Sequence, residues 1–107
     1  MRLGLFGDIH GEPEKLEKVL LALQERGVSR SYFICLGDIV GDEIAENPAP
    51  TEKCIRMVKH NSTTSVQGNH DELALLAWKG YLSQEAVEFL SAMAPSIQAM
   101  DTLVIHD

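Results

Sequence analysis

The stretch RLGLFGDIHG, residues 2–11, joins a short apolar run to a loop of glycine and polar residues. The run at 2–6 is typical of a buried β-strand, and Gly7 and Asp8 end it. A helix is predicted next, because Pro13 suits a first helical turn and apolar residues follow at helical spacing (Leu16, Val19, Leu20 and Leu23). The chain therefore opens with a strand, a loop and a helix.

Two further runs repeat this arrangement. Strands are predicted at 32–36 and 63–67, and each is closed by a glycine and a polar residue, Gly37-Asp38 and Gly68-Asn69. Helices are predicted at about 51–60, 71–79 and 84–93, with Ser83 as the N-cap of the last, and a final strand at 102–105. This alternation predicts an α/β fold with a largely parallel sheet and βαβ crossovers. Residues 1–107 are interpreted as one domain, because no linker or repeat divides them.

The composition is that of a globular domain and disfavours several partners. Nine basic and 16 acidic side chains give a formal net charge of −7, which disfavours extended nucleic acid and anionic membranes. No apolar run approaches the roughly 20 residues that span a bilayer, and no signal peptide is recognised, so a cytoplasmic protein is expected. Cys35 and Cys54 are expected to be reduced thiols, since they form no CxxC motif. A small phosphorylated substrate held by a metal ion stays compatible with this charge.

Polar side chains follow each expected strand where it ends. Asp8 and His10 follow the first strand, Asp38 the second, Asn69 and His70 the third, and His106 the fourth. Asp38 lies 30 residues after Asp8, and Asn69 lies 31 residues after Asp38, so each interval is close to one βαβ unit of roughly 30 residues. Because open α/β sheets bind ligands at the carboxyl ends of their strands, we expect these side chains to share one edge.

The side chains expected at this edge are those that bind first-row metal ions. They combine two carboxylates, two imidazoles and one amide oxygen, a set that suits Mn, Fe or Zn (Asp8, His10, Asp38, Asn69 and His106). Asp38 has two carboxylate oxygens and can bridge two cations about 3.5–4 Å apart. Glycines beside the donors allow tight turns and the close approach of a metal ion or phosphate (Gly7, Gly11, Gly37 and Gly68). The pattern therefore predicts a metal centre that acts on a phosphoryl group.

Three motifs resemble those of the calcineurin-like metallophosphoesterase family in order and spacing: Gly7-Asp8-Ile9-His10-Gly11, Gly37-Asp38 and Gly68-Asn69-His70-Asp71. The family pattern is D-x-H, then G-D, then G-N-H-D or G-N-H-E, then a lone His, and finally G-H-x-H. His106 looks like the lone His. The segment from Gly37 to Gly41, followed by prolines before a helix, is most similar to the small bacterial and archaeal phosphodiesterases of the family.

The resemblance implies a site with two divalent metal ions, which would be Mn, Fe, Zn or Ni. It assigns Asp8, His10 and Asp38 to one ion, and Asp38, Asn69 and His106 to the second. It also implies that His70 lies near the scissile phosphate, where it stabilises charge or protonates the leaving group, and that Asp71 orients His70 from behind. The implied activity is phosphodiesterase-like hydrolysis of phosphate esters.

The chain departs from the family pattern in its C-terminal part. The G-H-x-H motif, which supplies one further histidine to each ion, has no match up to Asp107, and only the first of the family's two facing sheets is expected. The chain therefore resembles the N-terminal half of a phosphoesterase, and one face of its sheet lacks an expected cover. Self-association, or a partner chain over that face, is predicted.

Other functions stay open from the residues alone. One is a non-catalytic metal-binding or interaction module derived from a truncated phosphoesterase, because five protein donors under-coordinate two ions. Another is a Ser/Thr protein phosphatase or dinucleoside tetraphosphatase, but these place Arg-Gly where this chain has Gly41-Asp42. Whether the chain is an active enzyme is therefore open. The acidic loop with Asp42, Glu43 and Glu46 is predicted to be a solvated surface.

Overall fold

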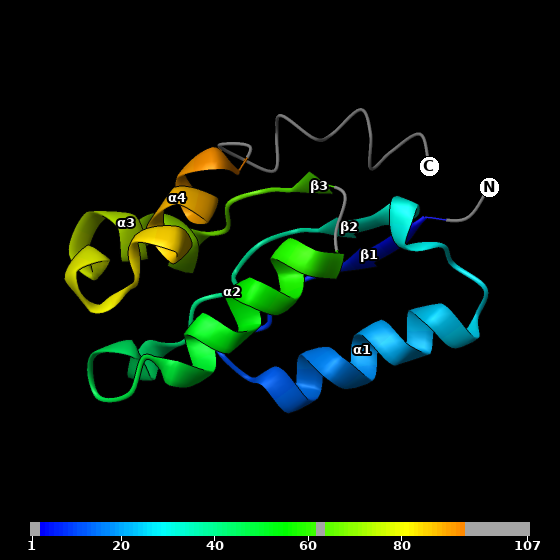
Figure 1. The fold of residues 1–107 in the computed structure, drawn as a ribbon, viewed down its shortest axis with the longest axis horizontal. Coiled ribbons are helices and arrows are strands. Elements are labelled where there is room, and N and C mark those ends of the chain that lie inside the picture. Colours follow the sequence, from blue (N-terminus) through cyan, green and yellow to red (C-terminus); the bar gives the residue numbers. More distant parts are fainter. Residues whose placement is uncertain (1–2, 62–63, 94–107) are drawn as a thin grey trace.

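The computed structural model describes residues 3–61 and 64–93, and these follow the expected α/β order (Figure 1). The strands are β1 (Gly4–Phe6), β2 (Phe33–Cys35) and β3 (Thr64–Ser65). They form a parallel sheet in the order β1-β2-β3, with Leu5 opposite Ile34. The predicted parallel sheet is therefore confirmed over these residues. The strand predicted at 102–105 lies outside the described residues.

Four α-helices and three short 3₁₀ turns lie in the described ranges. The α-helices are α1 (Pro13–Glu25), α2 (Ala49–Asn61), α3 (Asn69–Ala77) and α4 (Gln84–Ala92). The 3₁₀ turns are η1 (Arg30–Tyr32), η2 (Asp42–Ala45) and η3 (Lys79–Tyr81). None of the helices in these ranges is long and apolar enough to cross a membrane.

Local signals explain where several helices begin and end. Pro13 is the first residue of α1, and Gly27, with φ +80°, lets the chain turn away after its last residues. Ser83 caps α4 as predicted, because its hydroxyl accepts the Ala86 N–H at 3.1 Å. The backbone N–H and the hydroxyl of Ser83 also donate to the Glu52 carboxylate at 2.6 and 2.9 Å. This contact ties the start of α4 to α2.

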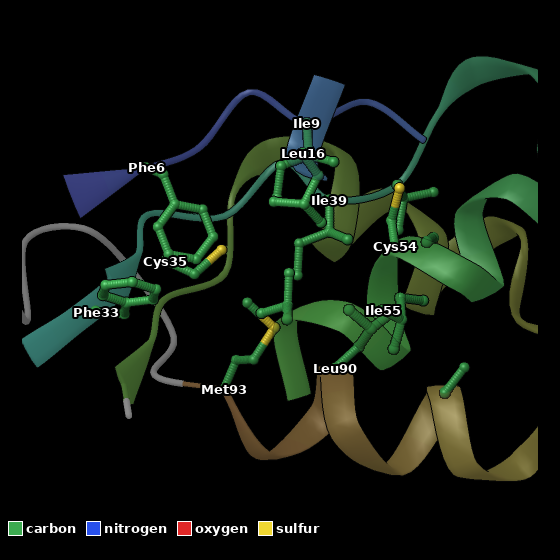
Figure 2. Packing of buried hydrophobic residues seen from close by; sticks show 14 of the residues in the cluster. Phe6, Ile9, Leu16, Phe33, Cys35, Ile39, Cys54, Ile55, Leu90 and Met93 are labelled. Atoms are coloured by element: carbon green, nitrogen blue, oxygen red, sulfur yellow. The ribbon is translucent and has the colours of Figure 1, made fainter. Parts of the chain in front are cut away.

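The larger core lies between one face of the sheet and the helices (Figure 2). Phe6, Phe33 and Cys35 belong to it, and the two phenyl rings meet edge to face with their centroids 6.3 Å apart. Buried residues of the helices complete this core (Leu16, Cys54, Ile55 and Leu90). The helices therefore cover one face of the sheet, which is what βαβ crossovers produce when they share a side.

Both cysteines lie in this core. Cys35 and Cys54 are free and buried, which confirms the expectation that they do not form a disulfide. Burial raises the pKa of each thiol from an ordinary 9.0 to about 12. Both therefore stay protonated at neutral pH, where a thiol is a poor nucleophile.

The opposite face of the sheet carries a smaller apolar cluster. Ile34 and Val66 are buried there, and partly buried leucines pack against them (Leu3, Leu5 and Leu36). Leu5 and Ile34 face the same way because they are register partners in adjacent strands. Self-association or a partner chain over this face stays a prediction.

Candidate metal centre

The loops that follow β1 and β2 run side by side and are joined by backbone hydrogen bonds. The Asp8 N–H donates to the Gly37 carbonyl at 3.2 Å, and the His10 N–H donates to the Asp38 carbonyl at 2.9 Å. These bonds continue the pairing of the two strands beyond their ends. The D-x-H segment and the G-D segment are therefore held in a fixed register.

The loop that follows β3 packs against the same region, and glycine is required where it does so. Gly37 has φ +94°, and a Cβ added there would collide with the backbone of Val66 and Gly68. A Cβ added to Gly68 would collide with the backbone and carboxylate of Asp38. These two glycines allow the second and third loops to touch, which brings Asp38 next to the start of α3.

Asp71 anchors the second loop to α3. Its side chain is fully buried, and its carboxylate accepts four backbone N–H groups: those of Ile39 (2.9 Å), Val40 (3.2 Å), Asp38 (2.8 Å) and Gly68 (3.0 Å). Burial raises the pKa of Asp71 above its ordinary value, and the four N–H groups oppose this by stabilising the carboxylate. The side chain therefore ties the backbone of residues 38–40 to the start of α3.

The predicted role of Asp71 in orienting His70 stays a prediction. In the described part of the chain, the hydrogen-bond partners of the Asp71 carboxylate are backbone amides and not the His70 ring. The reason lies in its position, because Asp71 is the third residue of α3. A side chain there folds back on the helix N-terminus, here to the Gly68 N–H. Asp71 is therefore a loop-anchoring residue.

Three candidate ligands have left-handed backbone conformations. Asp8, His10 and Asp38 have φ values of +52°, +48° and +56°, and no other non-glycine residue of the described ranges has a positive φ. Residues with side chains adopt this region at an energetic cost, and such strain concentrates at functional sites. The hydrogen bonds between the loops maintain these conformations. The backbone therefore singles out the same residues as the motifs.

His10, Asp38 and His70 form a group in which one ligand atom of each lies within 4.8 Å of the other two. The backbone N–H of His70 donates to Asp38 Oδ1 at 3.0 Å and so orients that carboxylate. His70 Nδ1 lies 3.6 Å from the same oxygen, and the rings of His10 and His70 meet edge to face with centroids 4.6 Å apart. Two imidazoles and a carboxylate at these separations fit a first-row divalent cation.

The remaining predicted ligands are not part of this group. Asp8 is at its rim, because its side chain is 81% exposed and its Oδ1 lies 3.7 Å from His10 Nε2. Asn69 is exposed as the first residue of α3. His106 lies outside the described residues. The ligand roles of Asp8, Asn69 and His106 therefore stay predictions, and so does a second ion.

One acidic contact was missed by sequence reasoning. Asp42, the first residue of η2, has a side chain that is 80% exposed, as predicted for the acidic loop, but its Oδ1 lies 3.0 Å from His70 Nε2. The only indication of this contact in the sequence was that Asp42 follows closely after the G-D motif. That proximity did not indicate which way the carboxylate would point.

The fold and this group define a class of protein: an α/β domain whose loops after the parallel strands carry side chains that could hold a metal ion. The family model of the calcineurin-like phosphoesterases matches residues 1–103. The chain therefore belongs to the calcineurin-like phosphoesterase family. No curated protein and no solved structure matches the chain.

Proposed function

We propose that the protein is a metal-dependent phosphoesterase that hydrolyses a small phosphorylated substrate in a phosphodiesterase-like reaction. The observation that carries this proposal is the group of His10, Asp38 and His70, whose ligand atoms lie within 4.8 Å of one another. Membership of the phosphoesterase family supports the class of reaction. The strained backbone at His10 and Asp38 further supports a functional role for this group.

The residues divide into metal ligands and a substrate-facing histidine. In this proposal Asp8, His10 and Asp38 hold one divalent ion, and Asp38, Asn69 and His106 hold a second. Two such ions, whether Mn, Fe, Zn or Ni, would supply Lewis-acid stabilisation of the phosphoryl oxygens and an activated water nucleophile. His70 stabilises charge on the phosphoryl group or protonates the leaving oxygen.

Hydrolysis of bis-p-nitrophenyl phosphate with added Mn²⁺ tests the proposal. Asp38 is shared by both ions, so Asp38→Asn is expected to abolish turnover, since an amide cannot bridge two cations as a carboxylate does. Glu46→Gln is the matched control, because it removes the same charge from an exposed residue of the following loop and should leave turnover unchanged.

The same assay separates the proposal from a non-catalytic module. Calorimetric titration with Mn²⁺ reports binding independently of turnover. Binding without hydrolysis at any Mn²⁺ concentration would favour a metal-binding module and contradict the enzyme. Turnover that survives Asp38→Asn would contradict the assignment of the site.

A further inference from the structure

Helix α3 carries apolar side chains on its exposed face. Its inner face is buried at Asp71 and Ala74, whereas Leu73 and Leu76 are 44% and 79% exposed. Leucine is among the residues most often buried in folded domains, and a single exposed one needs no explanation. These two lie one helical turn apart, so they form one apolar surface, which we call the leucine pair.

The leucine pair begins beside the candidate metal centre. Residues three and four positions apart are neighbours on a helix surface. Leu73 follows Asn69 by four positions and His70 by three, and His70 is the histidine that the proposed function places next to the substrate. The His70 ring itself lies close to His10 and Asp38. A phosphoester whose phosphoryl group lies beside His70 can therefore extend one of its ester groups onto the leucine pair.

The charge next to the leucine pair limits what it can bind. Glu72 is exposed and lies four positions before Leu76, so its carboxylate is a neighbour of the pair on the helix surface. A second anionic group on the substrate would be repelled by this carboxylate. The leucines themselves offer only apolar contact, which suits an uncharged, apolar group such as an aromatic ring.

A second copy of the chain fits the leucine pair less well than a small substrate does. A stable interface between proteins buries about 800 Å² on each partner and involves roughly 20–30 residues a side. Two leucine side chains supply a small part of that area. They are enough, however, to line one side of a subsite for a single aromatic ring.

We propose that Leu73 and Leu76 form a specificity subsite that selects phosphoesters with an aromatic ester group. The inference rests on the proposed function and deepens it by naming the substrate class. In this arrangement the metal centre and His70 take the phosphoryl group, and the ring lies against the leucine pair. The leucines take no part in the chemistry, so they affect the binding of the ring and not the reacting atoms.

Two phosphonates that cannot be hydrolysed test the subsite, because phenylphosphonate and methylphosphonate share the anionic group and differ in the ring. Both are measured as inhibitors of bis-p-nitrophenyl phosphate hydrolysis with Mn²⁺. Leu73→Ser should raise the inhibition constant of phenylphosphonate about fivefold and leave that of methylphosphonate unchanged. This is less than the roughly tenfold that one methylene is worth in an enclosed apolar pocket, because the leucine pair is open to solvent.

Leu21→Ser is the matched control, because Leu21 is 48% exposed but belongs to α1. It should change neither inhibition constant. Leu76→Ser should raise the constant of phenylphosphonate less than Leu73→Ser does, since Leu76 is one helical turn farther from His70. Equal weakening of both phosphonates by Leu73→Ser, or no weakening of either, would overturn the proposal.

A second readout does not depend on turnover. The ¹³C-methyl signals of Leu73 and Leu76, assigned with the two serine variants, should shift when phenylphosphonate is added to protein with Zn²⁺, and methylphosphonate should shift them much less. Such shifts in protein that does not hydrolyse bis-p-nitrophenyl phosphate would support the subsite and contradict the proposed function. Methyl signals that do not respond to phenylphosphonate would overturn the subsite. So would a dimer that Leu76→Ser dissociates in sedimentation, because the leucine pair would then be an interface between copies.

Discussion

Replacing Asp71 with alanine should destabilise the protein through the four backbone N–H groups that its carboxylate accepts. The bonds from Ile39 and Val40 are buried, whereas those from Asp38 and Gly68 are partly buried, so water can replace the carboxylate more easily at the latter two. The change removes one acceptor group and leaves two buried donors without a partner.

The magnitude follows from those two donors. Each buried N–H left unsatisfied costs about 1–3 kcal/mol, so the pair costs about 2–6 kcal/mol. Part of this is offset, because the variant no longer buries a carboxylate whose pKa is raised by desolvation. We therefore expect the free energy of unfolding to fall by about 2–4 kcal/mol, a large part of the roughly 5–15 kcal/mol that stabilises a typical domain.

Urea unfolding followed by circular dichroism measures this loss. Glu72→Ala is the control, because Glu72 is the next acid in the first turn of α3 and is exposed, so its loss should cost about 0.3–1 kcal/mol through the helix dipole. Asp71→Asn keeps one acceptor oxygen and should fall between wild type and Asp71→Ala. If the alanine variant does not fold, the asparagine variant carries the comparison. A loss in Asp71→Ala no larger than that in Glu72→Ala would refute the anchoring role.

Two further predictions concern glycine and the thiols. Gly68→Ala places a methyl group against the Asp38 carboxylate, so it should abolish Mn²⁺ binding in calorimetry, whereas Gly80→Ala, which meets nothing within 4 Å, should not. Because Gly68 has φ −94°, alanine fits the backbone conformation of residue 68, so the expected loss comes from the collision with the carboxylate and backbone of Asp38. Cys35 and Cys54 should react slowly with a thiol reagent in native protein at about pH 8 and rapidly in urea. The pKa of each thiol is about 12 in the folded protein and 9.0 in the unfolded chain. The stability that the two thiols contribute is therefore complete below pH 9 and is lost as the pH rises toward 12. Urea unfolding at several pH values across this range measures that loss.

The sequence was sufficient to predict which loops meet. Apolar runs and helical periodicity located the segments that became β1, β2 and β3 and the helices between them, because burial of apolar faces depends on the spacing of side chains. A glycine and a polar residue after each run then marked where the strands end. The parallel connection of the strands brought Asp38 and the start of α3 to one edge, as the intervals between the motifs indicated.

The contacts within the site could not be predicted in the same way. Spacing places Asp71 close to His70 in the chain, but the direction of its side chain depends on four N–H groups, three of them from residues more than 30 positions away. The contact of Asp42 with His70 likewise depends on how η2 packs against the D-x-H loop. These orientations arise from tertiary packing, which residue patterns do not encode locally.

The central claim is that the loops after the strands bring His10 and Asp38 to one cation, with His70 beside it. An anomalous difference map from crystals soaked in Mn²⁺ tests it most directly. The account predicts a manganese peak within bonding distance of a carboxylate oxygen of Asp38 and an imidazole nitrogen of His10. A manganese peak bound elsewhere on the chain, or no peak at these side chains under saturating Mn²⁺, would contradict it.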